Sequence, residues 1–315
     1  MDRIKELERI AKAIRFDTVS AIGHLGVGHI GGCLSIVELL TVLYFEAMHI
    51  DPADPKKEGR DRFICSKGHA GPAVYATLSR RGYFDRALLW TLNQGGTELP
   101  SHCDMLRTPG IDMTTGSLGQ GFSCAVGAAI GSKWAHDSAT VFTVIGDGES
   151  QEGQIWEAAM LAGNQELSNL VAFTDRNRYQ LDGDVEDVNG LEPLADKWMA
   201  FNWNVIEVED GNNVAEVLEA VRRAKTLRSS GKPTMVLLRT VKGKGISFVE
   251  AMGAGNHNAN ISPEQTVSAL SEILGRNIGV TVEDVREARF PDPMDLLIAD
   301  EGREPAPETP QGRTE

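Results

Sequence analysis

Two oxygen-bearing side chains follow two strand-like apolar runs and could hold a metal ion between them. Asp147 ends the run ATVFTVIGD and stands between two glycines, and Asn177 follows the later run LVAFTD. Hard cations such as Mg²⁺ bind carboxylate, amide and main-chain carbonyl oxygens of the protein. Phosphate oxygens of a bound ligand often supply further coordination. We therefore predict a site for Mg²⁺, or for another divalent cation such as Ca²⁺ or Mn²⁺, formed by Asp147, Asn177 and the main-chain carbonyl of Tyr179.

The residues that follow Asp147 favour an anion as the partner of this metal. Gly148 and Glu149 open a helix-like segment, and the amide groups at a helix N-terminus attract phosphate. We expect diphosphate oxygens and water to complete the coordination of the metal. The alternative is that Gly-Asp-Gly is only a strand-to-helix turn with a capping aspartate. Asn177, placed after the next strand-like run, favours the metal site.

Strand-like and helix-like segments alternate along the chain that carries these residues. Apolar runs of strand length lie at 139–147, 170–175, 203–208 and 233–241. Such alternation predicts an α/β fold with a doubly wound parallel sheet flanked by helices, in which ligands bind beyond the carboxyl ends of the strands. An apolar helix expected at 34–48 and a helix of small residues at 121–135 are candidates for buried or interface surface.

The composition excludes several classes of partner. The formal net charge of −14 argues against nucleic acid and against an anionic membrane. No run of eighteen apolar residues occurs, so no membrane span is expected. The four cysteines are too few and too widely spaced for a disulfide scaffold or a CxxC metal site, which predicts reduced thiols and a cytoplasmic protein.

Five further motifs, taken in order, resemble those of the transketolase family. They are Gly-His-Ile-Gly-Gly (28–32), Ser-Lys-Gly-His (66–69), Leu-Pro-Ser-His (99–102), Thr-Thr-Gly-Ser-Leu-Gly-Gln-Gly (114–121) and Thr-Val-Lys-Gly-Lys-Gly (240–245). The Gly-Asp-Gly and the later Asn177 are similar to the thiamine diphosphate motif of that family. The resemblance covers about residues 10–260 and corresponds to the N-terminal, diphosphate-binding domain. It implies the thiamine-diphosphate-binding fold and thiamine diphosphate as cofactor.

The resemblance implies a role for each matching residue. The metal ligands would be Asp147, Asn177 and the Tyr179 carbonyl. The residues expected to bind the cofactor are His69, Gly116, Ser117, Leu118, Gly148, Glu149, Asn177 and His257. The residues expected to face the substrate or transfer protons are His29, His102 and His257. Histidine suits both tasks, because it can donate to phosphate and can exchange protons near neutral pH.

Three positions depart from the pattern of the family. Ser117 stands where proline is common, and Tyr179 is bulkier than the usual aliphatic residue, although a carbonyl ligand does not depend on its side chain. The largest departure is Gly-Asn-His-Asn-Ala-Asn (255–260), where His-Gly is expected. This loop hints at a specialised sugar donor.

The resemblance also implies a partner. We expect residues 1–260 to form the cofactor-binding domain, 261–290 a helical extension and 291–315 an acidic, flexible tail. A separate C-terminal transketolase subunit would supply the glutamate that activates the cofactor, in an α2β2 heterotetramer. Together the subunits would transfer a two-carbon ketol unit from a ketose to an aldose, with sugars or sugar phosphates as substrates, and this chain would be active only with that partner.

Two alternatives come from other classes. A thiamine-dependent subunit of a 2-oxoacid dehydrogenase also carries Gly-Asp-Gly and a late asparagine. It is expected to lack the Gly-His-x-Gly and Ser-x-Gly-His pair found here at 28–31 and 66–69. A non-catalytic protein that binds thiamine diphosphate is the other alternative, and the complete set of metal and histidine motifs argues against it.

Overall fold

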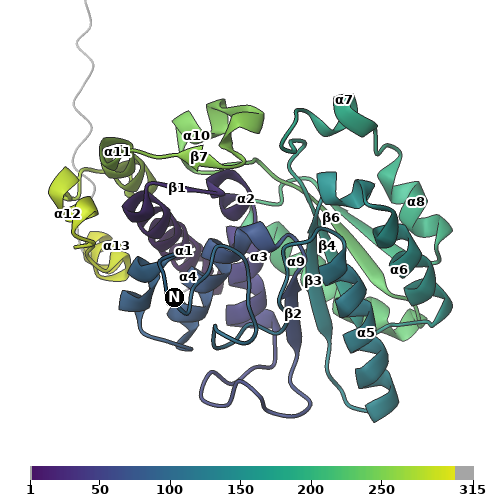
Figure 1. Ribbon diagram of the computed structural model, residues 1–315. Coiled ribbons are helices and arrows are strands. Elements are labelled where there is room, and N and C mark those ends of the chain that lie inside the picture. Colours follow the sequence, from purple (N-terminus) through teal and green to yellow (C-terminus); the bar gives the residue numbers. More distant parts are fainter. Residues whose placement is uncertain (1, 302–315) are drawn as a thin grey trace, which may run out of the picture.

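The computed structural model describes residues 2–301, and its centre is a five-stranded sheet in the order β2-β3-β4-β6-β5 (Figure 1). The strands are β2 (Arg62–Cys65), β3 (Val141–Gly146), β4 (Leu170–Arg176), β5 (Asn204–Val208) and β6 (Thr234–Arg239). Every neighbouring pair runs parallel. The predicted α/β fold with a doubly wound parallel sheet is therefore confirmed.

Helices cover both faces of the sheet and extend beyond the β2 edge (Figure 1). Their bounds are α1 (Arg3–Leu25), α2 (Ile30–Leu34), α3 (Val37–Val42), α4 (Gly71–Arg81), α5 (Gln120–Ala135), α6 (Gly153–Asn164), α7 (Val185–Asn189), α8 (Leu194–Ala200), α9 (Val214–Leu227), α10 (Ser247–Ala251), α11 (Pro263–Leu274), α12 (Val282–Arg286) and α13 (Pro293–Glu301). Two short strands, β1 (Val27–Gly28) and β7 (Ala259–Asn260), form a separate antiparallel ribbon.

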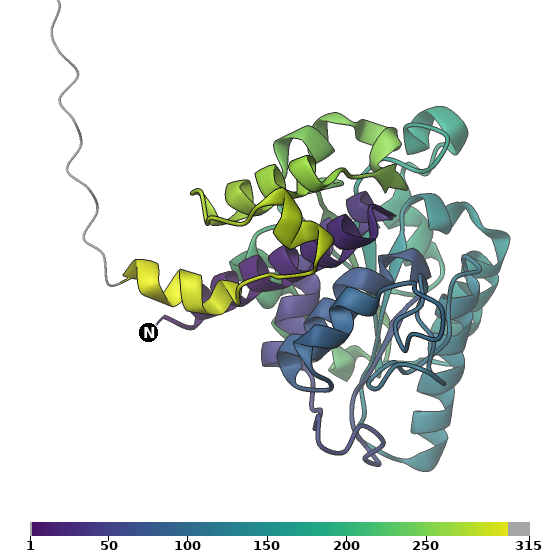
Figure 2. The ribbon, with the colours of Figure 1, turned by 60° about the vertical axis from the view of Figure 1, so that its left-hand side comes forward.

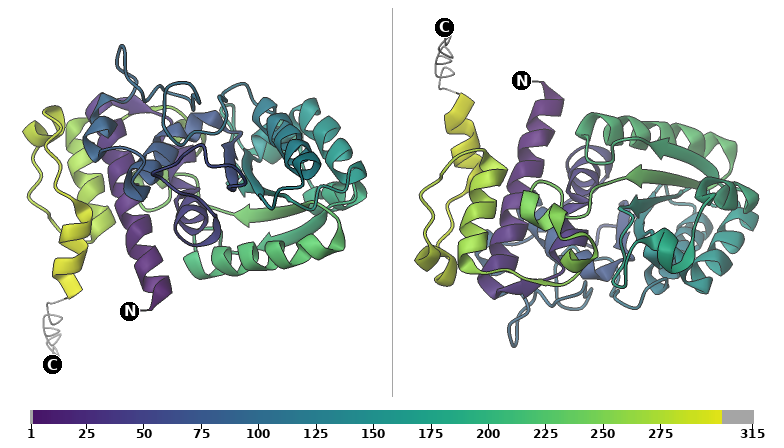
Figure 3. Two further views of the ribbon diagram at one scale, coloured as in Figure 1. Left: turned by 90° about the horizontal axis from the view of Figure 1, so that it is seen from below. Right: turned by 90° about the horizontal axis from the view of Figure 1, so that it is seen from above.

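Two apolar cores lie on the two faces of the sheet. Successive strand residues point to opposite faces, so Phe142 and Val144 of β3 join a core with α1, α3, α4 and α9. Val141 and Ile145 of the same strand join the other core, with α5, α6 and α8. Figure 3 shows α9 on one side of the sheet and α5 and α6 on the other. Burial on both faces explains why these strands read as continuous apolar runs.

The single helix expected at 34–48 is interrupted. α2 ends at Leu34, α3 begins at Val37, and a π-helical turn follows at Leu43–Ala47. Residues 34–44 are all buried, so this segment belongs to the core and offers no surface to another subunit. α5 differs, because its Trp134 is 76% exposed.

The β1–β7 ribbon joins segments that are far apart in the chain. α1 ends at a left-handed Gly26 (φ 87°), which turns the chain into β1. Gly28 then pairs with Ala259 of β7. Glycine favours the left-handed conformation of Gly26, because it has no Cβ to clash. The pairing places His29 beside His257, with 5.5 Å between the ring centroids.

The segment after the ribbon packs along α1 (Figure 2). Residues 261–290, expected to form a helical extension, contain α11 and α12. A Cβ on Gly23 of α1 would lie 2.2 Å from Thr266 Oγ1, so glycine permits the close crossing of α1 and α11. The flexible tail expected at 291–315 is wrong for 293–301, which form α13 with Leu297 buried. The remainder of that tail, 302–315, lies outside the described residues.

All four cysteines are free thiols, as expected. Cys33, Cys65 and Cys103 are buried, and Cys124 is partly exposed. Across residues 2–301, none of the helices combines the length and apolarity that a membrane crossing needs.

Candidate functional site

A cavity of about 470 Å³ lies beyond the carboxyl ends of β3, β4 and β6. The loops after these strands bring Asp147, Asn177 and Lys242 to its wall. Its other lining residues include Gly32, Lys67, His69, Leu118, Gly148, Glu149, Tyr179 and His257. This edge of the sheet is where ligands of a doubly wound fold bind. The predicted metal donors and most of the predicted cofactor-binding residues therefore share one cavity.

The register of the two central strands brings the predicted metal donors together. Asp175 of β4 pairs with the last residue of β3, so Asp147 and Asn177 follow at adjacent strand ends. Asp147 is 3% exposed, and its carboxylate accepts hydrogen bonds from the next main-chain amide (2.8 Å) and from that of Arg178 (2.5 Å). The amide oxygen of Asn177 accepts a hydrogen bond from the main chain of Tyr179 (3.1 Å).

This donor set fits a hard divalent cation. Burial, and after it the charge of Asp175, raises the pKa of Asp147 to about 7, because two carboxylates lie close together away from water. A cation favours the ionised form, and oxygen donors suit Mg²⁺, Ca²⁺ or Mn²⁺. Within residues 2–301 no group of three or more His, Cys, Asp or Glu could hold a metal ion. The donor set proposed here contains only one residue of those types.

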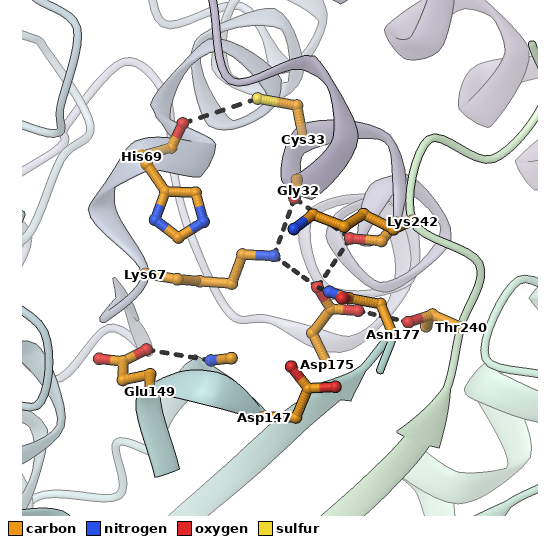
Figure 4. Close-up of polar contacts among 12 residues, drawn as sticks. Gly32, Cys33, Lys67, His69, Asp147, Glu149, Asp175, Asn177, Thr240 and Lys242 are labelled. Carbon is orange, nitrogen blue, oxygen red and sulfur yellow. Dashed lines mark hydrogen bonds and ion pairs between the residues drawn. The ribbon is translucent and has the colours of Figure 1, made fainter. Parts of the chain in front are cut away.

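A buried ion pair lies next to the predicted metal donors and holds Asn177 in place. The ammonium of Lys67 lies 2.5 Å from the carboxylate of Asp175 and donates to the carbonyl of Gly32 (2.8 Å) (Figure 4). Burial alone would raise the pKa of Asp175, but the charge of Lys67, together with hydrogen bonds from Lys67, Thr240 and Ser35, keeps the pKa below its usual value. Asp175 also accepts hydrogen bonds from the side chains of Ser35, Thr240 and Asn177. The last bond holds the amide nitrogen of Asn177, which leaves its oxygen for a metal.

Sequence reasoning gave no role to Lys67, Asp175 or Lys242. Lys67 and Lys242 stand inside the motifs at 66–69 and 240–245, but the side-chain partners of a lysine cannot be read from a motif. Asp175 carries the clearer signal, because it ends an apolar run of a buried strand. A charge in such a place requires a buried partner.

The carboxylate of Glu149 accepts hydrogen bonds from neighbouring loops of the protein. It is buried and accepts hydrogen bonds from Ser66 Oγ (2.5 Å) and from the main-chain amides of Gly119 (2.8 Å) and Gly146 (3.0 Å). These bonds tie the loop at 114–121 to the ends of β2 and β3. The helix expected to begin at Gly148 does not: residues 148–151 form a 3₁₀ turn, and α6 begins later. Any anion at this point would therefore meet the amides of a turn.

The three predicted residues of the 116–118 loop lie in different surroundings. Leu118 lines the cavity. Gly116 adopts φ 149°, and a Cβ there would lie 3.2 Å from Cδ2 of His102. Ser117 is exposed. The loop thus follows the edge of the cavity, with Gly116 packed against a histidine that was expected to face the substrate.

Four histidines from distant parts of the chain form one cluster. His29 lies 5.4 to 5.5 Å from His69, His102 and His257, measured between ring centroids. Burial lowers the pKa of all four, and Lys242 lowers the pKa of His257 further, to about 4. At neutral pH the four rings are therefore uncharged, so each can donate one hydrogen bond and accept another. Their assigned roles remain predictions.

Known proteins with similar sequences confirm the prediction of the family. The family described as "Transketolase, thiamine diphosphate binding domain" matches residues 7–286. The chain is 55% identical, over 85% of its length and 96% of the relative, to the 6-deoxy-6-sulfo-D-fructose transketolase subunit SqwG of Clostridium sp. (strain MSTE9). It is 37% identical, over 87% of its length and 96% of the relative, to a subunit of the apulose-4-phosphate transketolase of Phocaeicola vulgatus. These matches favour a transketolase over both alternatives.

Solved structures agree. A transketolase variant from Pichia stipitis superimposes with a TM-score of 0.82 and 28% identity, over 93% of this chain and 43% of that one. The transketolase of Leishmania mexicana gives 0.80 and 29%, over 94% and 45%. The chain thus spans less than half of these transketolases, but nearly the whole of the two subunits. It therefore belongs to the transketolase family and carries the thiamine-diphosphate-binding domain of that family.

Proposed function

We propose that this chain works with a separate C-terminal transketolase subunit in the cytoplasm to transfer a two-carbon ketol unit from a ketose to an aldose. One observation carries the proposal: a single cavity combines oxygen donors for a metal, Asp147 and Asn177, with uncharged histidines. The match along nearly the whole of relatives that are named subunits supports the division into two chains.

In this proposal each group of residues would have its own task. Asp147, Asn177 and the Tyr179 carbonyl would hold Mg²⁺, Ca²⁺ or Mn²⁺. The residues that would contact the diphosphate are His69, Gly148 and His257, and those beside the aminopyrimidine are Gly116, Ser117 and Leu118. Glu149, whose carboxylate is used within the protein, would position the 114–121 loop. Bound thiamine diphosphate supplies a carbon nucleophile and accepts the electron pair of the two-carbon unit.

The histidines would handle the protons of the substrate. His29 and His102 would donate to its hydroxyl groups, and His29 and His257 would take up and return protons. The lowered pKa of each ring keeps it uncharged, which leaves one nitrogen free to accept a proton. Their ring centroids lie 5.0 to 5.5 Å apart, so several proton acceptors would lie close to one substrate.

The donor is proposed to be a ketose with an anionic group on its terminal carbon, a sulfonate in particular. The relative with 55% identity is named for 6-deoxy-6-sulfo-D-fructose. With the reconstituted enzyme, kcat/KM for that sugar should exceed the values for fructose 6-phosphate and xylulose 5-phosphate. Equal values for all three would contradict this assignment of the donor while leaving the transketolase activity intact.

The two-chain proposal predicts that activity requires mixing. The chain and a partner with transketolase-like middle and C-terminal domains should each turn over a ketose at less than about 1% of the rate of the mixture, because the activating glutamate lies on the partner. Ketol transfer with a coupled aldose assay measures this rate. Titration calorimetry with Mg²⁺ and thiamine diphosphate should show tight binding only in the mixture. Full activity of the lone chain would rule out the division of the site.

The exposed face of α5 is the proposed contact with the partner. Gly127 and Gly131 have no atoms within 4 Å of an added Cβ, and the exposed Trp134 lies one turn further along. Gly131→Glu should weaken assembly by about tenfold or more, because it places a charge in an apolar contact. Ala215→Glu, on α9 across the sheet, is the matched control. Sedimentation velocity of the mixture measures both, and equal behaviour of the two variants would reject α5 as the contact.

A further inference from the structure

Lys242 brings a second buried ammonium group to the cavity. It follows β6 and is 4% exposed. Its Nζ donates to the main-chain carbonyl of Tyr179 (2.9 Å) and lies 3.2 Å from Nδ1 of His257. In the described part of the chain it forms no ion pair, whereas Lys67 is paired with Asp175. Figure 4 shows the two amines directed into the same space.

The contact with Tyr179 has a consequence for the metal. The proposed function uses that same carbonyl oxygen as a ligand, and this inference rests on that assignment. An ammonium group and a divalent cation on one oxygen repel each other strongly, because little water separates them. The metal can bind this oxygen tightly only when the ammonium group of Lys242 moves away.

The surroundings also indicate where the ammonium would go. Burial, and after it the charge of Lys67, lowers the pKa of Lys242 to about 8, and the negative charges of Asp147 and Asp175 do not offset these two effects. A diphosphate brings several negative oxygens into the cavity that Lys242 already lines. A charge-assisted bond to phosphate is stronger than the bond to a neutral carbonyl.

We propose that Lys242 makes metal binding depend on the diphosphate. Without diphosphate its ammonium competes with the metal for the Tyr179 oxygen, and with diphosphate it moves to the phosphate oxygens and releases the carbonyl. Lys242 is thus a positioning residue that couples the two ligands. The chain would bind the metal tightly together with diphosphate, and weakly when diphosphate is absent.

Mn²⁺ binding to the full chain mixed with its partner tests this proposal, with electron paramagnetic resonance as the readout. Inorganic diphosphate should tighten Mn²⁺ binding to the wild type by about tenfold or more, a usual size for coupled sites. Lys242→Met should bind Mn²⁺ alone more tightly than the wild type, bind diphosphate more weakly, and show an enhancement below about threefold. A purely structural role would weaken both ligands together.

Matched variants separate the possible outcomes. Lys244→Met makes the same change two positions away, outside the lining of the cavity, and should behave as the wild type. Lys242→Arg should keep most of the coupling, because it keeps the charge. Weaker Mn²⁺ binding by Lys242→Met, or no coupling in the wild type, would overturn the proposal. If Asp147→Ala binds Mn²⁺ as the wild type does, the metal site itself is wrong, and the proposed function fails on separate grounds.

Discussion

Asp147→Ala is expected to abolish the Mg²⁺-dependent binding of thiamine diphosphate. Asp147 supplies the only carboxylate of the proposed donor set, and the neighbouring Asp175 is already paired with Lys67. Loss of an outer-shell partner of a metal ligand already costs 10- to 100-fold in affinity, so loss of the ligand itself should cost more than about 100-fold. Titration calorimetry of the reconstituted enzyme measures the change.

Asp182→Ala provides the control for that experiment. Asp182 is exposed and lines the same cavity, but it is not a proposed ligand. Removing it tests whether the loss of any nearby negative charge weakens binding, and the expected change is less than about threefold. Tight Mg²⁺-dependent binding by Asp147→Ala would mean that Asp147 is an ordinary turn residue.

Lys67→Met is expected to destabilise the fold by about 3–5 kcal/mol, because it leaves a buried carboxylate without its counter-charge. Lys67 is 1% exposed and Asp175 is fully buried. The hydroxyl and amide donors around Asp175 remain, but they cannot replace a full positive charge. Urea denaturation, followed by circular dichroism, measures the free energy of unfolding.

Two further variants separate the charge from the packing. The double variant Lys67→Met/Asp175→Asn removes both charges and should recover a substantial part of the lost stability. Lys5→Met, on the exposed side of α1, should change stability by less than about 0.5 kcal/mol. If the double variant is as unstable as Lys67→Met, the ion pair does not account for the loss.

The sheet and the metal donors could be predicted because local pattern determines them. The run that ends at Asp147 is apolar apart from Thr140 and Thr143, since β3 is buried on both faces. The break after Leu34 could not be predicted, because the residues on both sides of it are all buried and the apolar pattern continues across it. α13 could not be predicted either, because it lies in a segment, 291–315, that is rich in Pro, Glu and Gly, although Leu297 is buried.

The supporting charges of the site were beyond a reading of the sequence for a different reason. Lys67 and Asp175 stand 108 positions apart, and only the parallel pairing of β2, β3 and β4 brings them together. The contact of Lys242 with Tyr179 likewise depends on two loops that follow different strands. A functional residue at the end of one strand can be recognised from the sequence. A contact between two loops can be recognised only when the fold is known.

The short ribbon of β1 and β7 bears on how the protein is made. His29 leaves the ribosome early, but its neighbour His257 follows only after the whole five-stranded sheet has been synthesised, about 10–50 s later at ordinary rates of translation. A nascent chain can hold the metal donors well before it holds the complete histidine cluster. Once the partner is present, cofactor binding should therefore select finished chains, and a ribosome stalled before codon 257 would release a product that thiamine diphosphate does not stabilise.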